Sequence, residues 1–138
     1  MIKEYNIIYL HDTETTLEGI KFYGSPRSNE FYNWAFMGSE MELSKAWAKI
    51  PEDTNVLITH GPAYGYHDLV SRPGDRDPHV GSESLTRRKE ILPELKLHIS
   101  GHIHEAYGTS TKGSTTNVCA SILNENYQLV NSPILTTI

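Results

Sequence analysis

Two short, mainly apolar segments, each followed within two residues by a histidine, constrain this sequence more than any other feature. Val56 to Thr59 is a compact apolar run followed by His60, and Leu95 to Ser100 is a second run followed by Gly101 and His102. The segment between them contains a helical pattern, so the two runs are predicted to be parallel strands joined by a crossover. Parallel strands end at the same edge of a sheet. The sequence therefore predicts an α+β (mixed α/β) fold with histidines gathered at one edge.

Local signals predict the other elements. Apolar residues at helical spacing indicate a helix from Met41 to Ile50, because Pro51 blocks its continuation. Ser82 is a suitable N-cap for a second helix, expected to run from Ser82 to Leu92. Runs of β-branched and aromatic residues predict further strands. Asn6 to Leu10 and Gly19 to Tyr23 are predicted to form a hairpin, and Thr15 to Leu17 would extend its second arm. Later strands are predicted at Thr115 to Ala120, Tyr127 to Val130 and Ile134 to Ile138.

Length and charge restrict the classes of function. The 138 residues fit one domain, 1–138, and contain no apolar run of the about 20 residues that span a bilayer. A net charge of -5, from 12 Lys and Arg against 17 Asp and Glu, disfavours general binding to nucleic acid or to anionic membranes. The basic run from Arg87 to Lys89 is interpreted as a solvated helix face. Cys119 is the only cysteine, which excludes an internal disulfide and favours a cytoplasmic protein.

The spacing of three histidines favours a metal site. His60 and His102 follow the two predicted parallel strands, and His104 lies two residues further on. In extended backbone the last two imidazoles project to one side, with Cα atoms about 6 to 7 Å apart, which suits two adjacent ions. Gly61 and Gly101 would let the backbone approach a bound substrate closely. Any one histidine alone is better explained as a strand-end or turn residue, but three at one edge favour metal ligands.

Two other sets of residues, one polar and one aromatic, have more than one possible role. The segment from Ala63 to Val80 is rich in Gly, Pro and Asp and is typical of an ordered loop that shapes a binding site. Its polar residues His67, Asp68 and His79 could contact phosphate or metal, or could be loop residues without a role. Aromatic side chains earlier in the chain could pack in the core or stack on a base; they are Phe31, Tyr32, Trp34 and Phe36.

The segments around these histidines resemble a known family. Thr59-His60-Gly61-Pro62 and Gly101-His102-Ile103-His104-Glu105 are similar to the last two motifs of the calcineurin-like metallophosphoesterases. The resemblance covers nearly the whole chain and is strongest to a small metallophosphoesterase-domain subgroup, whose members cleave phosphodiesters that include cyclic nucleotides. The other matching segments are Phe22 to Pro26, His79 to Gly81 and Tyr107 to Gly108.

The resemblance implies a fold, a chemistry and a ligand set. The family fold is a β-sandwich flanked by helices, and its complete site holds two divalent ions, which could be Mn, Fe, Ni or Zn. By this likeness His60 and His102 would bind the second metal and His104 the first, while a metal-bound hydroxide attacks the phosphorus. Gly61, Gly101 and His67 are then candidates for contact with a small phosphoester substrate. No catalytic residue is assigned with certainty, and His67 and His79 are weak candidates for that role.

Part of the family pattern is missing from this chain. The family's earlier motifs are an Asp-x-His, a Gly-Asp and a Gly-Asn-His, and none occurs before the first matching segment. We therefore expect the chain to be a carboxy-terminal half that needs an amino-terminal half for full activity. The partner would be a separately encoded half or a further copy in a homo-oligomer. The alternative is a degenerate module with the same half-fold, which binds metal or a partner but does not catalyse.

Overall fold

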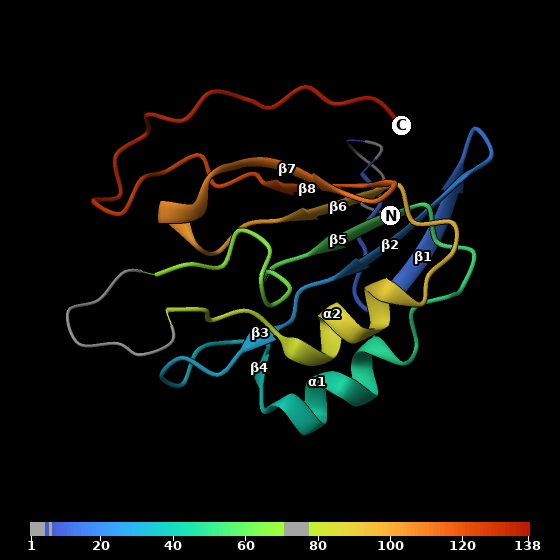
Figure 1. The fold of residues 1–138 in the computed structure, drawn as a ribbon, viewed down its shortest axis with the longest axis horizontal. Helices are drawn as coiled ribbons and strands as arrows, with labels where there is room; N and C mark the ends of the chain where they lie inside the picture. Colours follow the sequence, from blue (N-terminus) through green and yellow to red (C-terminus); the bar gives the residue numbers. More distant parts are fainter. Residues whose placement is uncertain (1–4, 6, 71–77) are drawn as a thin grey trace.

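A computed structural model describes residue 5 and the ranges 7–70 and 78–138 of the chain. Its main feature is a six-stranded sheet in the order β1-β2-β5-β6-β8-β7, beside a two-stranded sheet of β3 and β4 (Figure 1). Within the larger sheet, β2, β5, β6 and β8 are parallel and the two outer strands are antiparallel. The strands are β1 Thr13–Leu17, β2 Ile20–Ser25, β3 Ser28–Asn29, β4 Met37–Gly38, β5 Val56–Thr59, β6 Leu97–Ser100, β7 Gly108–Lys112 and β8 Thr115–Cys119. The predicted mixed α+β class is confirmed.

The helices lie together on one face of the sheet (Figure 1). They are α1 Glu40–Trp47 and α2 Glu83–Glu90, and a short 3-10 helix η1 covers His104–Ala106. As predicted, Ser82 caps α2, since its side chain accepts a hydrogen bond from the backbone of Leu85. α2 lies within its predicted range, while α1 begins one residue before the predicted Met41 and ends three residues before the predicted Ile50. None of the helices in the described ranges is long and apolar enough to cross a membrane.

The amino-terminal hairpin forms with a different first arm. β1 pairs with β2 from Thr13 to Leu17, whereas Ile7 to Leu10 belong to no named strand and Asn6 lies outside the described residues. The turn decides this arrangement, because Glu18 and Gly19 both adopt a positive φ, of 51° and 82°. Such a two-residue turn fixes the register immediately on either side of it. The assignment of Asn6 to Leu10 as the first arm was therefore wrong.

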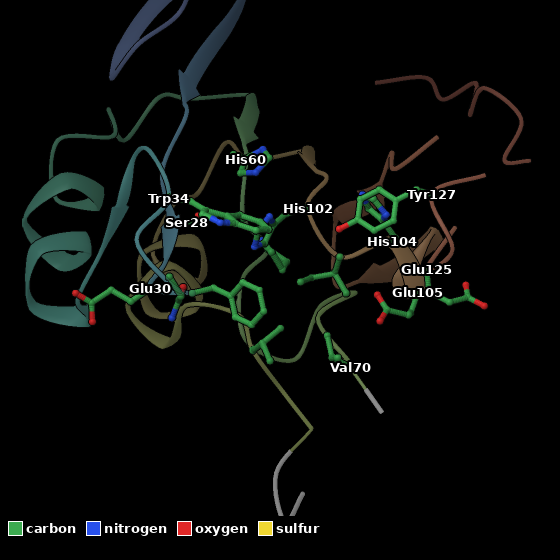
Figure 2. Close-up of a pocket in the computed structure, with 16 residues that line it drawn as sticks. Ser28, Glu30, Trp34, His60, Val70, His102, His104, Glu105, Glu125 and Tyr127 are labelled. Atoms are coloured by element: carbon green, nitrogen blue, oxygen red, sulfur yellow. The ribbon is translucent and has the colours of Figure 1, made fainter. Parts of the chain in front are cut away.

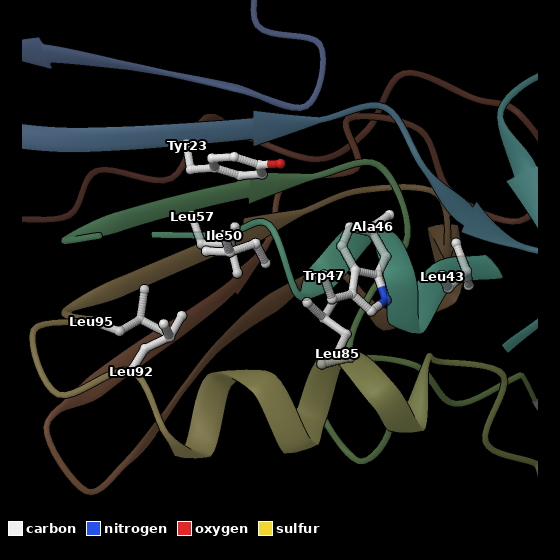
Figure 3. Close-up of a cluster of buried hydrophobic side chains, with 10 residues drawn as sticks. Tyr23, Leu43, Ala46, Trp47, Ile50, Leu57, Leu85, Leu92 and Leu95 are labelled. Atoms are coloured by element: carbon white, nitrogen blue, oxygen red, sulfur yellow. The ribbon is translucent and has the colours of Figure 1, made fainter. Parts of the chain in front are cut away.

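The core lies between the helices and the sheet (Figure 3). Trp47 of α1 is almost fully buried, and its indole N–H donates to Ser82 Oγ at 3.0 Å, so that it links the two helices. The opposite face of the sheet carries a smaller cluster of Val56, Leu97 and Val118, against which Ile134 packs. The predicted strands at Tyr127 to Val130 and Ile134 to Ile138 are wrong. The carboxy-terminal segment crosses this face with a single isolated β-bridge, between Leu123 and Leu129, among the described residues.

The basic run on α2 is not a solvated face. Lys89 is 7% exposed, and its ammonium donates to Asn117 Oδ1 at 2.6 Å and lies 3.9 Å from the centre of the Tyr66 ring. Burial, with a smaller effect of the Lys112 charge, lowers the pKa of Lys89 to about 7. Only the first residue of the run is solvated as predicted, because α2 turns its last turn toward β8.

We expect the free energy of unfolding to rise with pH above pH 7 because of Lys89. Its pKa in the unfolded chain is near 10.5 and falls to about 7 on folding, so between these values the unfolded state binds a proton that the folded state does not. The slope should approach about 1.4 kcal/mol per pH unit. Urea unfolding from pH 7 to 9 measures it. The Lys89→Met variant keeps the apolar stem but cannot titrate, and parallel pH profiles for the two proteins would refute the expectation.

Candidate metal and phosphoester site

The fold brings His60 and His102 together. β5 and β6 are adjacent and parallel, so the residues that follow them meet at one sheet edge, as the sequence predicted. The two imidazole ring centres are 4.8 Å apart, and the planes are tilted by 57°. The backbone N–H of Gly101 donates to the carbonyl of His60 at 3.1 Å, which joins the two turns directly. His102 adopts a left-handed φ of 67°, a conformation that side chains other than glycine seldom take and that is found at functional sites.

Both rings are held in the form that binds metals. Burial lowers the pKa of His60 and that of His102, and the neighbouring histidines lower the second further. Both imidazoles are therefore neutral at pH 7, with a lone pair available. No described residue hydrogen-bonds to either ring, and both residues line one pocket.

His104 lines the same pocket from its other side. Its Nδ1 lies 3.0 Å from the backbone carbonyl of Asn124, and its ring centre lies 5.1 Å from that of Tyr127. A carbonyl oxygen only accepts hydrogen bonds, so Nδ1 carries the proton and Nε2 carries the lone pair. Metal-binding histidines are commonly oriented by such a bond. Figure 2 shows this ring beside Tyr127, separated from the close pair of His60 and His102.

The pocket around the three histidines has a volume of about 460 Å³ (Figure 2). Trp34 packs edge-on against His102 at 6.4 Å between ring centres, and it is 53% exposed. Phe31 and Trp34 therefore line the pocket, whereas Tyr32 and Phe36 are exposed outside its lining, and stacking of any of them on a base stays a prediction. The pocket lining also includes four residues that were not predicted as site residues, namely Ser28, Glu105, Glu125 and Tyr127.

The two glycines differ in their relation to the pocket. Gly61 lines it, and a Cβ on this residue would lie 2.8 Å from Ser28 Cβ, so the site requires glycine there. The Ser28 hydroxyl is buried at this point without a hydrogen-bond partner among the described residues. Gly101 does not line the pocket, and a Cβ there would meet only Ser121 Oγ, at 3.9 Å. Substrate contact by Gly101 stays a prediction.

The polar residues of the long loop hold the loop itself. His67 bridges to Ala106 O and Ser110 Oγ, each at 3.0 Å, and is not part of the pocket lining. Asp68 is fully buried and accepts from His79 Nδ1 at 2.7 Å and from the Gly81 N–H at 3.0 Å. A role for His67 or His79 in substrate contact or catalysis stays a prediction, and their described contacts are structural.

The residues present fit only part of a metal-ligand set. The described ranges contain no group of three or more His, Cys, Asp or Glu side chains arranged to hold a metal ion. His60 and His102 suit two ligand positions of one ion, while His104 stands apart with its Nε2 available. The assignment of all three as metal ligands therefore stays a prediction. Two dications held close together would also need carboxylates to offset their charge.

Comparisons with known proteins agree with the resemblance in the sequence. The chain is 43% identical over 131 residues to metallophosphoesterase domain-containing protein 1 of Homo sapiens, and equally to that of Mus musculus. It is 38% identical over 133 residues to UPF0046 protein T07D4.2 of Caenorhabditis elegans. Each match covers 94% of this chain, which spans 39% of the mammalian proteins and 32% of the nematode one.

Two further comparisons bear on the fold. No family model matches the chain. A solved crystal structure superposes with a TM-score of 0.55 at 19% identity, over 81% of this chain and 45% of the other. At that identity the likeness concerns the fold alone.

Proposed function

We propose, from the premise that this chain is a relative of the metallophosphoesterase domain-containing proteins, that it contributes a histidine cluster to a divalent-metal phosphoesterase site. The observation that carries the proposal is the pair of neutral imidazoles, 4.8 Å apart, at the ends of two adjacent parallel strands. They open onto a pocket of about 460 Å³, which is within the range of small-molecule sites.

The residues of this chain would have distinct tasks. His60 and His102 would hold one ion, and His104 would offer Nε2 to a second, with its ring oriented by the bond to Asn124. A bound divalent ion would supply Lewis acidity toward a phosphoryl oxygen. Trp34 and Tyr127 would exclude water and hold the organic part of a small phosphoester, such as a cyclic nucleotide. The metal could be Mn, Fe, Ni or Zn.

We also propose that residues beyond these 138 complete the site, whether they belong to a longer protein or to a separate chain. Before its first matching segment the sequence lacks the Asp-x-His, Gly-Asp and Gly-Asn-His motifs of the family. A hollow of about 430 Å³ lies on the other side of His60 and is lined by exposed apolar residues. Ile7, Ile8, Tyr9 and Ile58 form part of it and are 36% to 63% exposed. A segment that packs here would reach His60 directly.

One experiment tests the proposal. The chain is mixed with the polypeptide encoded immediately upstream, loaded with Mn²⁺, and assayed for hydrolysis of bis-p-nitrophenyl phosphate. We expect turnover by the mixture and little by either part, with metal content measured per chain and mass measured in solution. Metal bound without turnover would favour the non-catalytic module. Absence of both would contradict the proposed function.

A further inference from the structure

A buried histidine outside the pocket is connected to the turn that carries His60. His98 lies on β6, opposite Leu57 of β5, on the sheet face that the helices cover. It is 2% exposed and contributes no atom to the pocket lining. Its Nε2 lies 2.9 Å from Thr59 Oγ1, and the same oxygen lies 2.6 Å from the backbone carbonyl of Gly61. The three groups form a chain of contacts that spans His60.

The donors in this chain of contacts follow from simple counting. The Thr59 hydroxyl has one proton, and the Gly61 carbonyl can only accept, so the hydroxyl donates to Gly61. The contact with His98 is then a hydrogen bond only if Nε2 carries a proton and donates to the Thr59 oxygen. The geometry thus assigns the Nε2–H tautomer to His98. Replacing the His98 imidazole or the Thr59 hydroxyl by an apolar group would interrupt this series of hydrogen bonds.

The two bonds hold the Gly61 carbonyl, which accepts no backbone hydrogen bond from the described residues. Backbone bonds of 3.1 Å hold the other polar groups of the turn: the His60 N–H donates to Ser25 O, the Gly61 N–H to Arg27 O, and the Gly101 N–H to the His60 carbonyl. The Gly61 carbonyl accepts from the Thr59 hydroxyl, so this bond ties the two residues on either side of His60 to each other. A leucine would fill the position of His98 in the core at a lower desolvation cost. The property that a histidine adds there is its N–H donor.

We propose that His98 is a positioning residue, which acts through Thr59 and Gly61 to aim the His60 imidazole into the metal pocket. The expected effect on metal affinity rests on the proposed function, in which His60 binds a metal ion. Groups that orient metal ligands in this way commonly change metal affinity by about 10- to 100-fold when they are removed. The connection itself is a property of the metal-free chain and can be measured separately.

The test compares variants that differ in the donor alone. His98→Leu removes the N–H, His98→Gln keeps one, Thr59→Val removes the hydroxyl, and Thr59→Ser keeps it. Leu57→Ala is the matched control, since it weakens the same buried row without touching the turn. Zn²⁺ affinity of the full chain is measured by competition with a chromophoric chelator, and amide hydrogen exchange is measured at His60 and Gly61. Thermal unfolding of every variant reports general destabilisation.

We expect His98→Leu and Thr59→Val each to weaken Zn²⁺ binding by about 10-fold or more. The double variant should lose no more than either single one, since both break one connection. His98→Gln and Thr59→Ser should retain most of the affinity, and Leu57→Ala should unfold earlier with its affinity kept. The two disrupting variants should also speed exchange at Gly61 selectively.

Two results would overturn the inference. One is a His98→Leu variant that matches Leu57→Ala in affinity and in exchange, which would reduce His98 to a core residue. The other is failure of His98→Gln to restore what His98→Leu loses. If the unaltered chain binds no Zn²⁺, the proposed function fails, and selective exchange at Gly61 alone then decides whether His98 positions the turn.

Discussion

Replacement of His102 by alanine is expected to abolish phosphodiester hydrolysis by the completed enzyme, with a loss of about 100-fold or more, equivalent to about 2.7 kcal/mol. His102 faces His60 across 4.8 Å, and its ring makes no hydrogen bond to any described residue, so its loss removes a ligand without unpairing a buried group. The rate of bis-p-nitrophenyl phosphate hydrolysis and the bound metal per chain should fall together.

Two controls make this result specific. His102 has a positive φ, and asparagine tolerates that conformation well, so His102→Asn tests the lost ligand with little backbone strain. His11 is an exposed histidine whose ring packs on Phe36 at 5.3 Å, outside the pocket lining. The His11→Ala variant should retain full turnover. Unchanged turnover in both His102 variants would remove this residue from the proposed site.

Replacement of Trp47 by alanine is expected to produce the largest loss of stability in this chain, about 3 to 5 kcal/mol. The side chain is 1% exposed in the main core, and its indole donates to the Ser82 hydroxyl that caps α2. The variant therefore leaves a cavity and removes a helix-to-helix hydrogen bond at once. Urea unfolding followed by circular dichroism measures the change.

Two variants separate the parts of this effect. Trp47→Phe keeps most of the apolar contact but loses the indole donor, and should cost about 1 kcal/mol for the hydrogen bond in addition to the volume change. Met41→Ala changes a residue of the same helix that is 68% exposed, and should cost no more than about 0.5 kcal/mol. A loss below about 1 kcal/mol for Trp47→Ala would contradict the assignment of this residue to the core.

The His102 variants test the chemistry of the pocket, and the Trp47 variants test the stability of the core. The variants of His102 change chemistry at the sheet edge, while those of Trp47 change the packing that holds the sheet and helices together. The lining of the pocket and the main core cluster share no residue. We expect the His102 variants to lose metal-dependent turnover while they unfold normally. We expect the Trp47 variants to lose stability while the folded protein keeps its turnover.

The sequence alone determined the elements whose signals are local. β5 begins and ends at the predicted residues, α2 starts after the predicted N-cap, and β6 runs parallel to β5 as the crossover pattern requires. These succeed because capping, proline and a short apolar run act within a few residues. β7 was missed, since Gly-Thr-Ser-Thr-Lys contains no apolar alternation, and it forms only by pairing with β8.

Only the tertiary structure decided what surrounds the paired histidines. The sequence placed His60 and His102 at one edge, because parallel strands share an end, but it contained nothing to show that Trp34 packs beside them or that His104 turns toward Asn124. Nor could it distinguish a solvated Lys89 from one buried against Asn117. Contacts between residues far apart in the chain depend on how whole elements pack, and local periodicity carries no record of that packing.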